Sequence, residues 1–226
     1  MAIELYQPLP SPIRGVLFDM DGLVLDTEKL FCRFWQEAAQ DFGLSMTWEQ
    51  ALGMRALSRE LGNAQIRKYF GPEADYLAIR SRRIALMEAY ILEHGTELKP
   101  GIRELLDFLD SRGIRAAITS SSPTERIRRY LSFHGLDQRF AALCSGHQVA
   151  RGKPEPDIYL FGAQSLALPP AQCLALEDAP SGILAAHRAG CVTVMIPDLD
   201  QPGDDTRKLL HARADSLLDI ITLLQR

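Results

Sequence analysis

The chain has 226 residues, enough for one large domain or for a domain that carries an insert. Its composition, 46% hydrophobic and 24% charged, is ordinary for a globular protein, and no apolar run is long enough to span a bilayer. A formal net charge of −4 gives no electrostatic reason to expect a nucleic acid or an anionic membrane as a partner.

The cysteines and the N-terminus indicate a reducing compartment. The four cysteines are scattered without the C-x-x-C spacing of zinc or redox motifs, so we expect buried free thiols, no disulfide framework and no zinc site. The segment Met1–Pro12 has neither the basic start nor the apolar core of a secretory signal. We therefore expect a cytoplasmic protein. The cysteines are Cys32, Cys144, Cys173 and Cys191.

The first predicted strand, Ile13–Phe18, ends in two aspartates. The strand is short, apolar and partly β-branched, which is typical of a buried strand, and Asp19, Asp21 and Gly22 follow it directly. Open α/β sheets bind ligands at the carboxyl ends of their strands. Two carboxylates this close repel each other unless a cation or a proton lies between them. A divalent metal site and a solvated Asx-turn both remain open from these residues alone.

The next segment breaks the pattern of the rest of the chain. Residues 27–95 contain helical patterns and no convincing strand, so they predict a small all-helical cap domain inserted after the first strand. An insert directly after the first strand would lie over its carboxyl end, where a substrate lid is needed. The alternative is that these segments are the first helices of one continuous fold. The helices expected here are Glu28–Phe42, Trp48–Leu61, Ala64–Phe70 and Glu73–Leu92.

After the turn Lys99–Gly101 the chain alternates between strands and helices. This alternation predicts an α/β core of residues 1–26 and 96–226, with a Rossmann-like, doubly wound parallel sheet. The expected strands are Ile114–Thr119, Phe140–Cys144, Cys173–Leu176 and Cys191–Ile196. The expected helices are Ile102–Arg112, Thr124–His134, Pro156–Leu166, Ser181–Ala189 and, after a polar loop over Pro197–Asp205, Ser216–Leu224.

A serine cluster follows the second strand of the core. Ser120, Ser121 and Ser122 precede Pro123 and a predicted helix that begins at Thr124. Hydroxyls and free amides at a helix N-terminus can bind an anion, but the same residues also make an ordinary helix cap.

Two further segments carry charge near strand ends. Lys153 lies between turn residues and prolines that restrict its backbone, so its ammonium could be aimed at a fixed target; the alternative is a lysine in solvent. Glu177 and Asp178 end another strand, where they could bind a hard divalent cation or merely cap the next helix. Taken together with Asp19 and Asp21, these groups predict a metal-assisted phosphate site at one end of the sheet.

These motifs resemble the haloacid dehalogenase superfamily, in its phosphatase and phosphomutase-like branch with a helical cap. The resemblance covers nearly the whole chain, and within this branch the chain looks most like the beta-phosphoglucomutase-like and pseudouridine-5′-phosphatase-like members. All four family motifs occur in family order. They are Asp19–Glu28, the serine cluster, Gly152–Asp157 and Glu177–Gly182.

The resemblance implies a role for each acidic residue. Asp19 would attack phosphorus and become an aspartyl-phosphate, and Asp21 would act as general acid and then as general base. Mg²⁺ would be bound by the carboxylates of Asp19 and Asp178 and by the backbone carbonyl of Asp21, with Glu177 nearby or acting through water.

The same resemblance assigns the remaining groups of the core. Ser120 would hydrogen-bond the transferring phosphoryl group with help from the amide of Ser121, and Lys153 would balance the charge between Asp19 and the phosphoryl oxygens. Thr119 is the alternative to Ser120 by a shift of one residue, but Ser120 puts Pro123 where the family pattern has it.

Two positions bear on the reaction class. Dehalogenase members lack an aspartate at the position of Asp21, so Asp21 favours phosphate esters over haloacids. Phosphoglucomutase members have a histidine in the first cap helix where this chain has Phe31, which favours hydrolysis. We therefore expect a monomeric, magnesium-dependent phosphatase of a small metabolite, either a sugar phosphate or a nucleoside monophosphate. A phosphomutase and a non-catalytic protein that binds a phosphorylated ligand remain the alternatives.

The sequence leaves two interpretations open for several residues of the cap and the loops. Arg55 could reach over the site and hold a phosphate or another substrate oxygen, or it could be a surface arginine. Phe31, Phe34 and Trp35 could face the substrate, but an aromatic stripe on a helix is more often core. His147 is expected in a loop near the site and not as a metal ligand.

Overall fold

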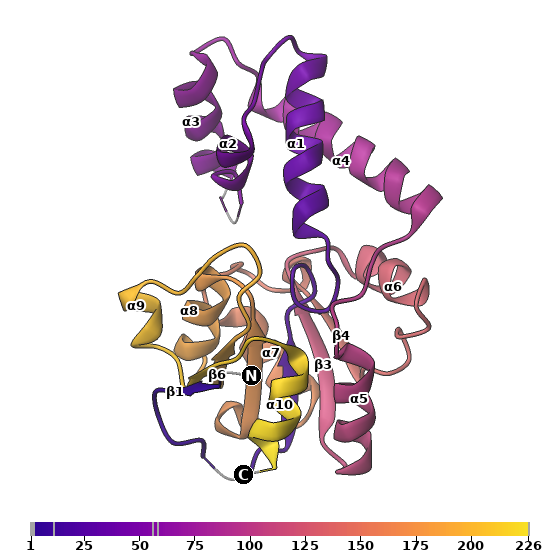
Figure 1. Ribbon diagram of the computed structural model, residues 1–226, viewed down its shortest axis with the longest axis vertical. Helices are drawn as coiled ribbons and strands as arrows, with labels where there is room; N and C mark the ends of the chain where they lie inside the picture. The colour runs from indigo at the N-terminus through magenta and orange to yellow at the C-terminus, as the bar shows by residue number, and fades with distance from the viewer. Residues whose placement is uncertain (1–2, 11, 56, 58, 226) are drawn as a thin grey trace. The chain divides into compact units, whose positions relative to one another are not determined.

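The computed structural model describes residues 3–10, 12–55, 57 and 59–225. The chain divides into two compact units, one of residues 1–26 and 97–226 and the other of residues 27–96. The first unit contains the sheet and its flanking helices, and the second contains helices α1 to α4 (Figure 1). We call them the sheet unit and the helical unit.

The sheet has seven strands within the described residues, in the order β1-β7-β6-β5-β2-β3-β4. All neighbouring strands from β7 to β4 pair in parallel, and β1 is antiparallel to β7. The predicted α/β class with a mainly parallel sheet is therefore confirmed. The strands are β1 (Glu4–Leu5), β2 (Gly15–Phe18), β3 (Arg115–Ser120), β4 (Ala142–Ser145), β5 (Cys173–Glu177), β6 (Val192–Met195) and β7 (Ala212–Arg213).

The central strand β2 is buried along its whole length because β3 and β5 pair with it on either side. One side of the sheet packs against α7 and α8, whose apolar residues form a core cluster with those of the strands. Helices α5 and α10 pack against each other, and α5 contacts β3. The helices of this unit are α5 (Ile102–Ser111), α6 (Thr124–Ser132), α7 (Asp157–Ser165), α8 (Pro180–Arg188), α9 (Asp204–Arg207) and α10 (Leu217–Leu224).

Three short elements of the sheet unit were not predicted. Strands β1 and β7 have two residues each, too few for an alternating pattern, and they pair with each other at the edge of the sheet. Helix α9 begins at Asp204, at the end of the segment Pro197–Asp205 that was expected to be only a polar loop, and runs to Arg207. Its four residues are too few to give a helical periodicity in the sequence.

In the helical unit, the second and third helices differ from the prediction. The elements are α1 (Glu28–Asp41), α2 (Trp48–Leu52), α3 (Arg59–Phe70) and α4 (Tyr76–His94). The predicted helix over Trp48–Leu61 was wrong, because α2 ends at Leu52 and α3 continues past Gly62. Gly62 lies within α3, and Tyr76 packs against it so closely that an added Cβ would lie 2.7 Å from the Tyr76 hydroxyl. Ala56 and Ser58 of the predicted helix lie outside the described residues.

All four cysteines are buried and free, as predicted. Burial raises the pKa of Cys173 to about 11 and that of Cys191 to about 12, so both remain protonated thiols near neutral pH. None of the described helices has the length and apolar character that crossing a membrane requires.

A half-buried histidine at the edge of the sheet makes stability depend on pH. The ring Nδ1 of His211 accepts a hydrogen bond from the backbone amide of Thr193 at 3.2 Å, which requires an unprotonated Nδ1. Burial, together with the charge of His187, lowers the pKa of His211 below its usual value of 6.5. Its contribution to the free energy of unfolding is therefore full above pH 6.5 and is lost as the pH falls through the lowered pKa.

We expect His211→Asn, which keeps an acceptor near the Thr193 amide, to weaken this pH dependence. The difference in melting temperature between wild type and variant should shrink when the pH is lowered from about 7.5 to about 5, because only the wild type loses the histidine term. Thermal unfolding at both pH values measures it. An equal difference for His211→Asn would contradict the assignment.

Candidate active site

Asp19 is placed by the central strand. It directly follows β2, and its amide donates to the carbonyl of Leu176 on β5 at 3.0 Å. Its side chain is almost fully buried. The chain then turns at Gly22, whose φ of 86° lies in the left-handed region that favours glycine. This turn begins directly after Asp21, so the two aspartates stay close to the end of the strand.

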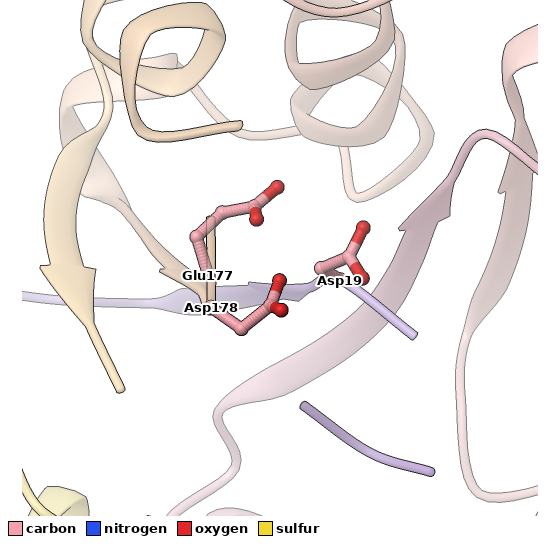
Figure 2. Close-up of side chains that lie close together, drawn as sticks. All are labelled: Asp19, Glu177 and Asp178. Carbon is pink, nitrogen blue, oxygen red and sulfur yellow. The ribbon is translucent and has the colours of Figure 1, made fainter. Parts of the chain in front are cut away.

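Glu177 and Asp178 lie at the end of the adjacent strand β5. Both are buried, and helix α8 begins two residues later at Pro180. The carboxylates of Asp19, Glu177 and Asp178 each offer an oxygen within 4.8 Å of the others (Figure 2). Gly182 of α8 gives Glu177 its space, because a Cβ there would lie 1.9 Å from the Glu177 carboxylate. Capping of α8 alone does not explain three converging carboxylates.

Lys153 reaches this cluster from the segment before α7. Its side chain is only 9% exposed, and its ammonium donates to Asp19 Oδ1 and, at 2.5 Å, to Glu177 Oε1. The alternative of a lysine in solvent was therefore wrong. Asp19 and Glu177, which lie 134 and 24 residues from Lys153 along the sequence, therefore meet at its ammonium.

The charges of the cluster depend on one another. Burial by itself lowers the pKa of Lys153, but the carboxylates of Asp19 and Glu177 outweigh it and hold this pKa well above its usual range. Burial, with the charge of Asp19 adding to it and Lys153 opposing it, raises the pKa of Glu177 to about 7. Lys153 therefore remains cationic near neutral pH, while Glu177 holds its negative charge weakly.

Tyr159 belongs to the same cluster and was not predicted from the sequence. Its hydroxyl donates to Glu177 Oε1 from the buried face of α7. Burial and the negative charge of Glu177 raise the pKa of Tyr159 well above its usual value, so it remains a hydrogen-bond donor. No spacing in the sequence signals this contact, because a buried tyrosine on an amphipathic helix is normally core.

The serine cluster begins at the end of β3. Ser120 is the last residue of the strand, and its Oγ accepts a hydrogen bond from the amide of Ser122 at 3.1 Å. Thr119 is fully buried, and its hydroxyl donates to the carbonyl of Phe18 at 3.2 Å. The Thr119 hydroxyl thus donates to the neighbouring strand, whereas the Ser120 hydroxyl, which is equally buried, accepts a hydrogen bond and can still donate its proton.

Ser122 links this segment to Asp21. Its Oγ lies 3.4 Å from Asp21 Oδ2, and its carbonyl accepts a hydrogen bond of 2.7 Å from Ser145 Oγ at the end of β4. Ser121 is exposed. His147 lies in the short 3-10 helix η1 (Gly146–Gln148) and is exposed, as expected for a loop residue.

Arg55 lies in the helical unit, three residues after the end of α2. Its side chain is only 7% exposed and forms an ion pair with Glu28 of α1. The alternative of a surface arginine was therefore wrong. Phe34 and Trp35 are buried in the helical unit, as an aromatic core stripe predicts.

Phe31 is occupied by its neighbours in the helical unit. Its ring packs edge-on against Trp35 with centroids 6.1 Å apart, and the Arg83 guanidinium lies 4.6 Å from its centroid. A phenyl ring in this setting supplies no acid or base.

The cluster of the sheet unit suits a divalent metal. Three buried carboxylates converge and one ammonium contacts two of them, so ionised groups leave an excess of negative charge that a divalent cation would neutralise. Carboxylate oxygens are also the ligands that hard divalent cations prefer. Glu177 Oε1 accepts hydrogen bonds from both Lys153 and Tyr159. The carboxylates of Asp19 and Asp178 are the possible metal ligands that are not bonded to Tyr159.

Comparison with known proteins identifies the family of the chain. The family model for haloacid dehalogenase-like hydrolases matches residues 16–196. The chain is 34% identical over 198 residues to hexitol phosphatase A of Escherichia coli, covering 86% of each chain. It is 32% identical over 219 residues to protein CbbY of Cereibacter sphaeroides, covering 92% of each.

A solved structure shares the fold. Beta-phosphoglucomutase from Clostridium difficile superimposes with a TM-score of 0.75 at 22% identity, over 92% of this chain and 93% of that one. At this identity the likeness concerns the fold alone. The matched family model spans the aspartates of β2, the serine cluster, Lys153 and the acidic end of β5. The predicted family is therefore confirmed: the chain belongs to the haloacid dehalogenase-like hydrolases.

Proposed function

We propose that the protein is a Mg²⁺-dependent phosphatase that hydrolyses the phosphate monoester of a small metabolite. The observation that carries this proposal is the buried cluster in which Lys153 lies between Asp19 and Glu177, with Asp178 beside them. A monoester dianion and a carboxylate nucleophile repel each other, so the reaction requires fixed positive charge between them.

In the proposed mechanism Asp19 is the nucleophile. One carboxylate oxygen attacks phosphorus as the bond to the leaving oxygen breaks, which gives an aspartyl-phosphate and the free alcohol. Lys153 holds the Asp19 carboxylate through its ammonium, which orients the attacking oxygen and balances charge on the phosphoryl group. Glu177 holds Lys153 in place by accepting a hydrogen bond from its ammonium, and Tyr159 holds Glu177 in place by donating to the same carboxylate.

Asp21 is the proposed general acid and base. It would give its proton to the leaving alcohol oxygen, then accept a proton from the water that attacks the aspartyl-phosphate. The hydroxyl of Ser122 lies within 3.4 Å of its carboxylate and supports one orientation. Ser120, with the Ser121 amide, would hydrogen-bond the phosphoryl oxygens.

Mg²⁺ would be held by the carboxylates of Asp19 and Asp178 and the carbonyl of Asp21, with Glu177 beside it. When bound, it would neutralise negative charge on the phosphoryl oxygens and so favour attack by an anionic nucleophile. The small, oxygen-rich donor set supports Mg²⁺, which prefers one or two carboxylates together with phosphate and water.

The helical unit is the proposed cap, and Arg55 is its candidate for binding a substrate oxygen. The buried Arg55–Glu28 pair offers both hydrogen-bond donors and an acceptor, which suits hydroxyl-bearing substrates. A sugar phosphate or related polyol phosphate is the proposed class, supported by the relative named as a hexitol phosphatase; a nucleoside monophosphate is the other class to test.

Phosphate release from a panel of sugar phosphates, polyol phosphates and nucleoside monophosphates tests this proposal, with Mg²⁺ and with chelator. We expect release that depends on Mg²⁺ and falls to background with chelator. Isomerisation of a sugar phosphate without net release would instead support a phosphomutase, for which Phe31 is unfavourable. Tight binding of an ester without any turnover would support a non-catalytic binding protein. Either result would contradict the proposed hydrolysis.

A further inference from the structure

The chain passes between its two units twice, after Asp26 and before Glu97. On the side of the sheet unit these two linkers pair with each other. Leu25 and Leu98 form an antiparallel bridge, the Asp26 amide donates to the Glu97 carbonyl at 2.9 Å, and the Lys99 amide donates to the Val24 carbonyl at 2.9 Å. The result is a short two-stranded ribbon, and a ribbon this short is marginal by itself.

Lys99 ties this ribbon to the sheet unit. Its ammonium lies 2.7 Å from Asp198 Oδ1 and 3.5 Å from Asp26 Oδ1. The side chains of Lys99, Asp198 and Asp26 are 20%, 7% and 15% exposed. Solvent and salt therefore screen the attraction between their charges less than that of a surface ion pair. One ammonium therefore joins both linkers to the segment that follows β6.

That segment leads directly to the candidate active site. Two residues before Asp198, the amide of Ile196 donates to the carbonyl of Glu177 at 2.8 Å. Among the described residues, the second carboxylate oxygen of Asp198 is buried and accepts no hydrogen bond. The charge of Asp198 thus depends on Lys99, and loss of that ammonium would leave a buried carboxylate uncompensated.

We propose that Lys99 is a positioning residue, whose ammonium fixes the paired linkers against the segment that is hydrogen-bonded to Glu177. This proposal rests on the proposed phosphatase function. Lys99 touches neither Asp19 nor the proposed metal ligands; it acts through the linkers that carry the helical unit. Mutation of linker residues that take no part in the reaction can change kcat and KM together.

The test compares Lys99→Met with Lys99→Arg and with the control Arg139→Met. Arg139 also bridges two aspartates, Asp107 at 2.8 Å and Asp110 at 2.7 Å, but it joins the segment before β4 to α5 and not to either linker. Amide hydrogen exchange at residues 24–26 and 97–99 reports on the ribbon. Values of kcat and KM for the preferred sugar phosphate and for p-nitrophenyl phosphate report on the site.

We expect Lys99→Met to speed exchange of the ribbon amides about tenfold and to lower kcat/KM for the sugar phosphate about tenfold. Turnover of p-nitrophenyl phosphate, whose leaving group has no hydroxyls for the cap to recognise, should change by less than about twofold. Lys99→Arg should restore both quantities towards wild type, and Arg139→Met should leave both unchanged.

Unchanged exchange at the ribbon in Lys99→Met would overturn the proposal. Equal losses for both substrates, in step with a lower melting temperature, would also overturn it, since they indicate a smaller folded fraction. If the wild type hydrolyses no ester, the proposed function fails, and the exchange measurement still decides whether Lys99 fixes the linkers. Asp198→Asn, which keeps Lys99 but replaces its charged partner with a neutral amide, should also speed exchange of the ribbon amides.

Discussion

Replacing Asp19 by asparagine is expected to abolish turnover while leaving the protein folded. The amide is nearly the same size as the carboxylate, so the buried space is filled as before. An amide cannot supply the attacking carboxylate oxygen, and it weakens both the bond to Lys153 and any metal ligation. We expect kcat to fall by about 10⁴-fold or more. Steady-state phosphate release measures the loss, and circular dichroism verifies the fold.

Asp107→Asn is the matched control for this substitution. Asp107 is an exposed aspartate paired with Arg139, so the same chemical change there should leave kcat within about twofold of wild type. A correctly folded Asp19→Asn protein with undiminished turnover would remove Asp19 from the mechanism. Loss of turnover in both variants would point to a general effect of the substitution.

Replacing Lys153 by methionine is expected to have the second largest effect. Methionine fills a similar volume but leaves the buried carboxylates of Asp19 and Glu177 without the cation that contacts both. Breaking a buried pair from one side costs about 3 kcal/mol of unfolding free energy, so we expect a loss of that size in chelator. We also expect kcat to fall about 100-fold or more, because the fixed charge beside Asp19 is lost. Urea unfolding and phosphate release measure the two effects.

Lys208→Met provides the comparison. Lys208 pairs with Asp205 at 2.8 Å, but both side chains are largely exposed, so this variant should change stability by less than about 0.5 kcal/mol. Adding Mg²⁺ should restore part of the stability of Lys153→Met, since a cation that binds the carboxylates of the folded state favours folding. Equal stability of Lys153→Met and wild type in chelator would contradict a structural role for this lysine.

Much of the sheet could be predicted because its central strands are short and mostly apolar. Apart from Arg115 at the start of β3, the residues of β2, β3, β5 and β6 are buried, so apolar side chains predominate on both faces. The edge pair could not be found this way. A two-residue strand such as β7 is defined by its pairing with β1 and β6, which is a property of the folded chain.

The helix boundaries show a second reason for failure. The prediction ended one helix at Leu61 and began the next at Ala64, whereas α3 runs through Gly62. The low helix propensity of glycine is a weak preference, and the missing Cβ of Gly62 leaves room for the Tyr76 ring. Contacts between distant segments of the chain override local propensity here.

The acidic groups of the candidate site could be predicted because topology brings them together. Asp19 and Asp178 follow the neighbouring strands β2 and β5, whose carboxyl ends meet in a parallel sheet. Tyr159 and Ser122 could not be predicted in the same way. Their contacts with Glu177 and Asp21 depend on side-chain directions across separate elements, and neither residue type is unusual at its position.

The most direct test of the account is to trap the covalent intermediate during turnover. The wild-type protein would be quenched with its preferred ester and Mg²⁺, treated with borohydride, which reduces an aspartyl-phosphate to homoserine, and mapped by peptide mass spectrometry. We predict conversion at Asp19 alone, and none in Asp19→Asn. Turnover with an unmodified Asp19, or with conversion at another carboxylate such as Asp178, would contradict the proposed role of Asp19.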